Sequence, residues 1–185
     1  FEAHYAEYIG TNHCIAVANG LDALYLLLRG YKEMGLMQDG DEIIVPANTF
    51  IATIIAITRN HLVPVLVEPT WEHLEIDIDK IEAAITPKTK GVMTVHLYGR
   101  IAYNDKLADI CKKHGLKLLE DSAQSHGCAW KGIKTGALGD AAAGGITWKV
   151  MSIAFPLFFT NVFGLTVADT ATLLLIALMF AVVTD

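Results

Sequence analysis

Apolar positions in the first 145 residues follow two patterns, short continuous runs and longer stretches with helical spacing. The runs are typical of buried strands and the spaced stretches of helices. Strands are predicted at 14–18, 42–45, 63–67, 75–78, 91–97 and 116–119. Helices are predicted at 1–9, 21–34, 50–59, 79–85 and 104–114. Because strands alternate with helices, we expect βαβ units, an α/β fold and a mostly parallel sheet.

Residues that favour turns and caps mark the ends of several of these elements. Asn48 or Thr49 is expected to cap the helix that begins near residue 50. Gly115 follows the helix at 104–114 and is a suitable C-cap. Residues 131–136 predict a tight hairpin, and residues 139–143 then lead into another strand of the sheet.

The charged residues stop abruptly near residue 149. From Val150 onward the only charged side chains are Asp169 and Asp185, which leaves uncharged runs of 19 and 15 residues. A helix that spans a membrane needs about 20 mostly apolar residues. We therefore expect one domain over 1–145 and an apolar helical tail over 146–185, which either spans a membrane or is foreign to the domain.

Composition excludes some classes of function. The formal charge of −6 provides no basic surface for nucleic acid. Cys14, Cys111 and Cys128 are odd in number and scattered, so we expect neither a disulfide framework nor a metal site, but a reducing compartment. The N-terminus has no signal-peptide pattern. Residues 1–5 read as the middle of an amphipathic helix, so we expect the chain to begin inside a longer protein.

Three candidate ligand contacts come directly after predicted strands. Asp121 ends the apolar run that begins at residue 116, and in open α/β sheets ligands bind outside the carboxyl ends of strands. Phe50 follows the strand at 42–45 and can stack on a flat ligand. Gly20 opens a helix whose first N–H groups can hold an anion. The alternatives are a capping acid, ordinary packing and a plain connection, respectively.

Four segments resemble the DegT/DnrJ/StrS family of sugar aminotransferases. They are Val17–Leu24, Asp41–Thr53, Val95–Gly99 and Glu120–Gly127. The resemblance implies a pyridoxal-phosphate enzyme with the aspartate aminotransferase fold (fold type I), of which this chain holds a truncated large domain. It also implies amination of a nucleotide-linked keto sugar, most similar to dTDP-3-keto-6-deoxyhexoses, with glutamate as the amino donor. A homodimer in which both subunits line each site is implied as well.

The resemblance also implies roles for the residues at the strand ends. Asp121 would pair with the pyridine nitrogen and keep the ring protonated, which makes the ring an electron sink. Gln124 would form a hydrogen bond with the phenolic oxygen of the cofactor. Phe50 would stack on the face of the pyridine, an arrangement that contributes roughly 0.5–1.5 kcal/mol beyond area burial.

The phosphate and the covalent link to the cofactor are the remaining parts of such a site. The phosphate would be held by the N–H groups of Leu21 and Asp22, which follow Gly20. The family pattern of a serine and a lysine is replaced here by residues 144–150. Lys149 is the candidate for the Schiff-base lysine, and a charge flanking the apolar segment is the alternative.

The tail has a second, shorter resemblance. Residues 158–185 are similar to the first helices of cation-coupled sugar symporters of the melibiose-carrier type, in which Asp185 would match an ion-binding acid. Three interpretations stay open: a transaminase, a fragment that binds pyridoxal phosphate without catalysis, and a membrane-associated fusion. We expect the front part to be cytoplasmic, with membrane association through residues 150–184.

Overall fold

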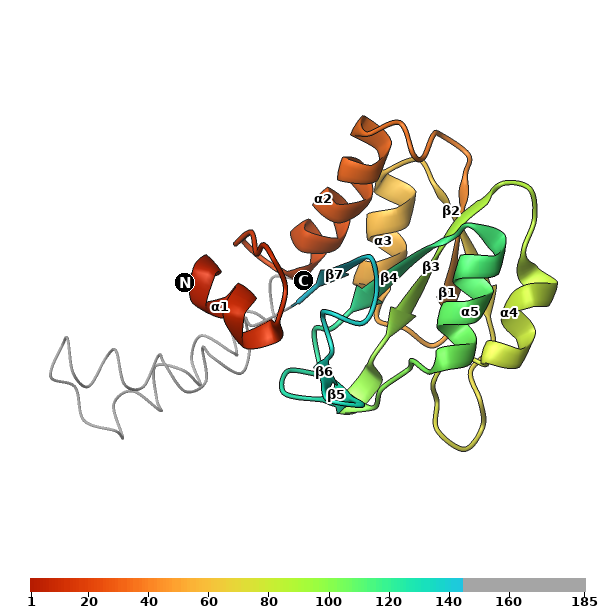
Figure 1. The fold of residues 1–185 in the computed structure, drawn as a ribbon. Coiled ribbons are helices and arrows are strands. Elements are labelled where there is room, and N and C mark those ends of the chain that lie inside the picture. Colours follow the sequence, from red (N-terminus) through yellow and green to blue (C-terminus); the bar gives the residue numbers. More distant parts are fainter. Residues whose placement is uncertain (145–185) are drawn as a thin grey trace, which may run out of the picture. The chain divides into compact units, whose positions relative to one another are not determined.

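The computed structural model describes residues 1–144, which form an α/β unit (Figure 1). Its helices are α1 (Glu2–Ile9), α2 (Gly20–Glu33), α3 (Ile51–Arg59), α4 (Ile78–Ala84) and α5 (Asp105–His114), with a 3-10 turn at Leu97–Gly99. Its strands are β1 (Glu42–Pro46), β2 (Val63–Val67), β3 (Thr89–Val95), β4 (Lys117–Asp121), β5 (Ala129–Trp130), β6 (Ile133–Lys134) and β7 (Ala141–Ala143). Lys149 and the tail predicted at 146–185 lie outside the described residues.

Five strands form one parallel sheet in the order β2-β1-β3-β4-β7. The predicted α/β fold with a mostly parallel sheet is therefore confirmed for the described part of the chain. In the pairing of β3 with β4, Val95 lies opposite Asp121, at the carboxyl ends of both strands. That edge is where an open α/β sheet binds ligands.

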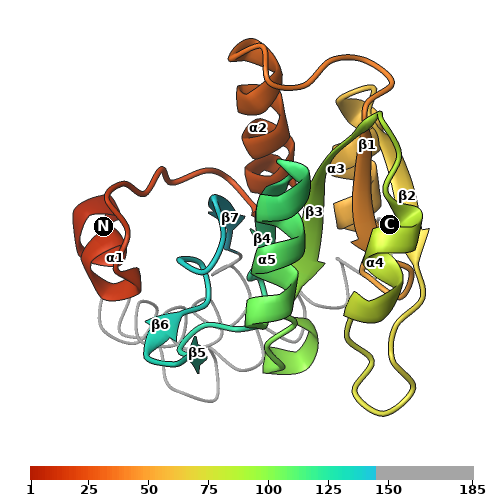
Figure 2. The same cartoon turned by 45° about the vertical axis from the view of Figure 1, so that its right-hand side comes forward.

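Helices cover both faces of the sheet. Helices α2 and α3 lie on one face, and α4 and α5 lie on the other (Figures 1 and 2). Neighbouring strand residues alternate between the two cores. Ile43, Met93 and Leu119 pack with α2 and α3, whereas Ile44, Val92 and Leu118 pack with α4 and α5. Burial on both faces explains why these strands read as continuous apolar runs.

One predicted strand and one predicted cap are wrong. Residues 14–18 form no strand and pair with none in the described chain, and Ile15 is 81% exposed. An apolar run becomes a strand only where a neighbour completes its hydrogen bonds. The N-cap of α3 is Phe50, without a side-chain hydrogen bond, because the Thr49 hydroxyl bonds to that of Thr53 instead, at 2.8 Å.

The predicted hairpin and the predicted C-cap are present in the structure. Strands β5 and β6 pair in an antiparallel hairpin around Lys131 and Gly132, which have φ values of 48° and 85°. Two successive positive φ values are the signature of a tight two-residue hairpin turn. Gly115 adopts the left-handed conformation after α5, as predicted. The strand expected at 75–78 is reduced to a single bridge between Pro69 and Ile76.

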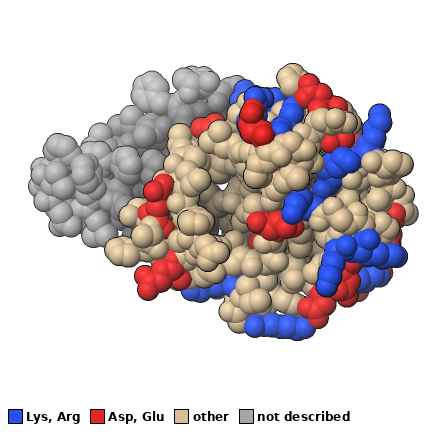
Figure 3. All heavy atoms as spheres, turned by 45° about the horizontal axis from the view of Figure 1, so that its top comes forward, with Lys and Arg blue, Asp and Glu red and all other residues tan. Residues whose placement is uncertain are grey.

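The surface of the described part mixes both signs of charge. Figure 3 shows Lys and Arg side chains lying among Asp and Glu side chains on one face. Several of them pair, for example Lys113 with Glu82 at 2.7 Å and Lys117 with Asp140 at 3.1 Å. Such exposed pairs contribute little to stability. Among the helices within residues 1–144, none has the length and apolar character required to cross a bilayer.

Two glycines are predicted to respond in opposite ways to alanine. A Cβ at Gly139 would lie 2.5 Å from the main-chain oxygen of Leu118, so Gly139→Ala should lower the free energy of unfolding by about 1–3 kcal/mol. A Cβ at Gly30, inside α2, meets nothing within 4 Å, so Gly30→Ala should raise it by about 0.5–1 kcal/mol. Urea unfolding of both variants measures the difference, and equal shifts would contradict the packing of the 139 loop on β4.

Candidate active site

The carboxyl ends of β1, β3 and β4 carry most of the residues predicted to act on a ligand. Phe50 follows β1, Tyr98 lies in the turn after β3, and Asp121 is the last residue of β4. Gln124 comes three residues later, in the loop after β4. The parallel sheet brings these segments to one edge because all of its strands run in the same direction.

Asp121 is a buried carboxylate with few hydrogen bonds. Its side chain accepts from the Thr53 hydroxyl at 3.0 Å and from the N–H of Ala123 at 3.2 Å. Burial raises the pKa of Asp121 above its usual value, although the bonds from Ala123 and Thr53 oppose the rise. A carboxylate in this condition gains from a cationic donor, which would lower its pKa again.

The donor set around Asp121 fits a protonated pyridine nitrogen. An ionised carboxylate has about four acceptor positions, and the described residues fill two of them. The neighbouring Ser122 hydroxyl is also buried and has no hydrogen-bond partner within residues 1–144. The site therefore has spare polar capacity at a position where a ring N–H could bind.

Gln124 and Phe50 are both open to solvent at the same edge. The Gln124 Oε1 atom accepts a hydrogen bond of 2.7 Å from the main-chain N–H of Tyr98. Phe50 is 69% exposed, so its ring is not part of the core. Within residues 1–144, no hydrogen bond joins Phe50 or Gln124 to Asp121, so these three residues share an edge without contacting one another through polar atoms.

The start of α2 is already partly capped. The Asn19 Oδ1 atom accepts from the N–H of Asp22 at 2.9 Å, and the Asn19 Nδ2 group donates to the Asp22 carboxylate at the same distance. An anion would therefore have to displace the Asn19 side chain to reach the Asp22 N–H. The N–H groups of Gly20 and Leu21 lie in the first turn, where a helix supplies no acceptor.

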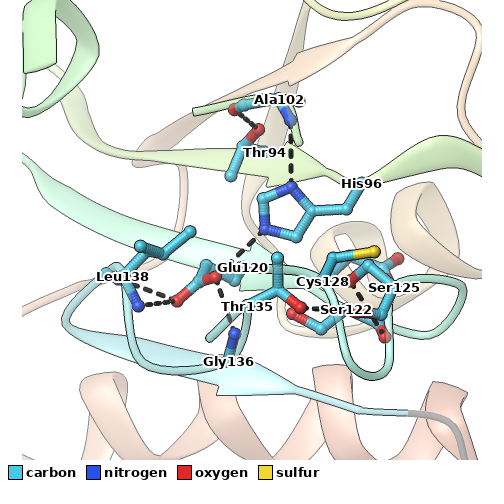
Figure 4. A network of polar contacts seen from close by, with 12 residues as sticks. Thr94, His96, Ala102, Glu120, Ser122, Ser125, Cys128, Thr135, Gly136 and Leu138 are labelled. Carbon is cyan, nitrogen blue, oxygen red and sulfur yellow. Dashed lines mark hydrogen bonds and ion pairs between the residues drawn. The ribbon is translucent and has the colours of Figure 1, made fainter. Parts of the chain in front are cut away.

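A buried pair of residues supports the ends of β3 and β4 (Figure 4). The Glu120 carboxylate accepts from His96 Nε2 at 3.0 Å, and from the N–H groups of Gly136, Leu138 and Gly139 at 2.7–2.8 Å. His96 Nδ1 accepts from the N–H of Ala102 at 3.1 Å, so the proton lies on Nε2. Burial works to raise the pKa of Glu120, but the bonds from His96, Gly136 and Gly139 outweigh it and hold the pKa below its usual value.

Sequence reasoning missed three contributors to this edge: Thr53, Tyr98 and the His96–Glu120 pair. Thr53 had a readable signal, because it lies one helical turn after Thr49 and both hydroxyls face the same side. His96 and Glu120 are polar residues in strand-end motifs, which favours a paired role once the strands are known to be neighbours. The left-handed backbone of Tyr98, with φ 56° and ψ 23°, has no sequence signal other than Gly99 beside it.

Comparison with known proteins identifies the family. The model of the DegT/DnrJ/EryC1/StrS aminotransferase family matches residues 1–144, and the chain belongs to this family. It is 51% identical over 142 residues to a dTDP-3-amino-3,6-dideoxy-alpha-D-galactopyranose transaminase of Aneurinibacillus thermoaerophilus, covering 77% of this chain and 38% of that protein. It is 43% identical over 143 residues to a dTDP-3-amino-3,4,6-trideoxy-alpha-D-glucose transaminase of Streptomyces venezuelae, with 77% and 37% covered.

Solved structures agree with this assignment. The S. venezuelae enzyme DesV, in complex with a ketimine intermediate, matches with a TM-score of 0.70 and 41% identity over 77% of this chain and 37% of that one. The E. coli GDP-4-keto-6-deoxy-D-mannose-3-dehydratase with bound hydrated PLP matches with a TM-score of 0.70 and 28% identity over 75% and 36%. The chain thus spans less than two fifths of the length of these relatives.

Replacing Asp121 is predicted to stabilise the chain in the absence of a ligand. Asn can accept from Ala123 and donate to Thr53, and it has no charge to desolvate, so Asp121→Asn should raise the free energy of unfolding at pH 7 by about 1–2 kcal/mol. Because burial raises the pKa of Asp121, its charge penalty is absent below the usual value of 3.8 and grows as the pH rises through the raised pKa. Thermal unfolding of the parent and of Asp121→Asn between pH 4 and 7 measures the difference in stability.

The surface change Asp109→Asn on α5 serves as the control and should leave the unfolding temperature unaltered at both pH values. An Asp121→Asn variant that is less stable than the parent at pH 7, or whose advantage is the same at pH 4, would contradict a penalty from the buried charge.

Glu120→Gln is predicted to destabilise the chain by about 3 kcal/mol at neutral pH, because an amide nitrogen would face either Gly136 or the Leu138 and Gly139 donors. Because the pKa of Glu120 is lowered, its contribution is complete above the usual 4.5 and is lost as the pH falls through the lowered pKa. The difference in unfolding free energy between the parent and Glu120→Gln should therefore be smaller in acid than at pH 7. The exposed Glu7→Gln on α1 is the control, and an equal effect of both changes would refute the special role of Glu120.

Proposed function

We propose that this chain carries the cofactor-binding part of a pyridoxal-phosphate aminotransferase that acts on a nucleotide-linked keto sugar. The observation that carries the proposal is the buried Asp121 carboxylate at the carboxyl end of β4, with acceptor positions to spare. The names of the relatives at 51% and 43% identity support a substrate of the dTDP-3-keto-6-deoxyhexose class. The bound PLP of the E. coli dehydratase supports the cofactor.

Pyridoxal phosphate, when bound, supplies an electron sink that stabilises negative charge at the carbon next to the transferred nitrogen. Asp121 holds the proton on the ring nitrogen, which keeps that sink effective. Thr53 orients the Asp121 carboxylate through its hydroxyl. Phe50 offers an exposed ring for stacking, and Gln124 offers an amide donor to the phenolic oxygen.

The phosphate of the cofactor is assigned to the start of α2. The N–H groups of Gly20 and Leu21 and the positive end of the helix dipole favour an anion there. The Asp22 N–H joins them only after the Asn19 side chain moves. Glutamate as donor, a homodimer and Lys149 as the Schiff-base lysine complete the proposal by resemblance to the family.

A second candidate is a fragment that binds the cofactor without catalysing transamination. The observation that favours it is length, since the chain spans 38% of the transaminase that it matches at 51% identity. The two candidates share the cofactor site and differ only in turnover. Membrane association through residues 150–184 remains a separate prediction from the sequence.

The full-length chain is expected to bind pyridoxal phosphate, with an absorbance change that saturates. Asp121→Asn should weaken this binding about 10- to 100-fold, because a charge-assisted hydrogen bond of roughly 1.5–3 kcal/mol is lost. Asp109→Asn should bind as the parent does. Parent-like binding by Asp121→Asn would refute the assignment of the ring nitrogen to Asp121.

Assay with a dTDP-3-keto-6-deoxyhexose and glutamate then separates the two candidates. Formation of the dTDP-3-amino sugar supports the transaminase, and saturable cofactor binding without product supports the binding fragment.

A further inference from the structure

We propose that the main-chain N–H of Tyr98 is a positioning group for Gln124. It donates to the amide oxygen of Gln124, fixes which way the amide faces, and leaves the amide nitrogen without a partner within residues 1–144. In the cofactor site, Gln124 then presents its amide nitrogen as a hydrogen-bond donor, which suits an anionic phenolic oxygen. The ligand side of this inference rests on the proposed function; the orientation of the amide does not.

The contact itself determines the orientation of the amide. A main-chain N–H can only donate, so the Gln124 atom at 2.7 Å from the Tyr98 nitrogen must be the oxygen. The amide nitrogen is the other end of the same planar group. Within residues 1–144, no hydrogen bond engages that nitrogen. Gln124 is exposed, so its free donor is accessible to a ligand.

Tyr98 adopts a backbone conformation that its side chain does not explain. Its φ of 56° and ψ of 23° lie in the left-handed region, which is unfavourable for a bulky residue. The side chain is 76% exposed, so no core packing compensates for the strain. The conformation does aim the N–H of Tyr98 at the loop after β4. Strain of this kind persists where the surrounding structure enforces it, and it is concentrated at functional sites.

The turn that contains Tyr98 is fixed at both ends. His96 Nδ1 accepts from the N–H of Ala102 at 3.1 Å, and the Thr94 hydroxyl donates to the Ala102 carbonyl oxygen, which closes the loop on β3. The buried His96 ring is itself held by Glu120, as Figure 4 shows. The Cys128 Sγ atom, in the loop between β4 and β5, donates to the Gly99 carbonyl oxygen at 3.1 Å. Together these bonds fix the turn and can hold the backbone of Tyr98 in the left-handed conformation.

The same frame also holds Asp121. The N–H of His96 donates to the carbonyl oxygen of Asp121 at 3.1 Å, and two residues later the N–H of Tyr98 donates to the side chain of Gln124. The segment after β3 therefore sets the position of both residues assigned to polar atoms of the cofactor ring. A rigid frame of this kind spares the ligand the entropy of ordering each side chain separately.

The orientation is tested first without any ligand, by amide hydrogen exchange in ¹⁵N-labelled full-length chain. Gln124→Ala should speed exchange of the Tyr98 amide at least 10-fold. Gln124→Glu keeps the acceptor and should retain slow exchange. The Arg100 amide, which bonds to the Leu97 carbonyl oxygen at 3.0 Å, is the internal reference and should not change. A Tyr98 amide that exchanges equally fast in parent and Gln124→Ala would overturn the proposal.

The donor role is tested with 4′-deoxypyridoxine 5′-phosphate, which keeps the ring nitrogen, phenolic oxygen and phosphate but needs no lysine. Gln124→Glu should bind it at least 10-fold more weakly than the parent in calorimetry, because a carboxylate has no N–H to donate and repels an anionic phenolic oxygen. Equal or tighter binding by Gln124→Glu would overturn the donor role, since it would mean that Gln124 accepts.

Two variants of Tyr98 separate the main-chain role from the aromatic ring. Valine disfavours the left-handed backbone and glycine favours it, while both remove the ring. Tyr98→Val should bind the analogue at least fivefold more weakly than Tyr98→Gly and should exchange its amide faster. Equal affinities would overturn the positioning role. A parent chain that does not bind the analogue would refute the proposed function and the donor role, while the exchange experiment would still decide the orientation.

Discussion

The buried carboxylate of Glu120 is the interaction on which the ligand-facing edge of the sheet depends. Its side chain is fully buried and accepts hydrogen bonds from His96, Gly136, Leu138 and Gly139. A buried charge is costly unless its acceptor positions are filled, and here four donors fill them. Those donors belong to the end of β3 and to the loop that leads into β7, so one side chain of β4 fastens both of its neighbours in the sheet.

Alternation along β4 places Glu120 and Asp121 on opposite faces, and the two acids differ accordingly. Glu120 is saturated with donors, and its pKa is lowered. Asp121 accepts from only two donors, and burial raises its pKa. The saturated acid stabilises the fold, whereas the unsaturated one costs stability and retains capacity for a ligand. A site that costs stability in the free protein is typical of function, because the missing interaction is supplied on binding.

The sequence predicts most elements but not how they are joined. The runs at 43–45 and 118–119 are apolar because both faces of the central strands are covered, and that signal is local. Residues 14–18 show the same run and form no strand in the described chain, since pairing depends on a neighbour that the run does not specify. The same limit applies to the site. Asp121 and Phe50 are placed at strand ends by pattern alone, but the bond from Thr53 to Asp121 spans 68 residues and depends on how α3 packs on the sheet.

The backbone conformation of Tyr98 is the feature of this edge that the sequence predicts least. Nothing in an aromatic residue favours positive φ, so the conformation follows from contacts made by residues distant in the chain, chiefly His96 with Glu120 and Cys128 with Gly99. The buried Glu120 carboxylate thus fixes the turn that contains Tyr98. That turn then orients the exposed amide of Gln124. The core does more than hold the sheet together, because through this sequence of contacts it determines which polar atoms the surface presents to a ligand.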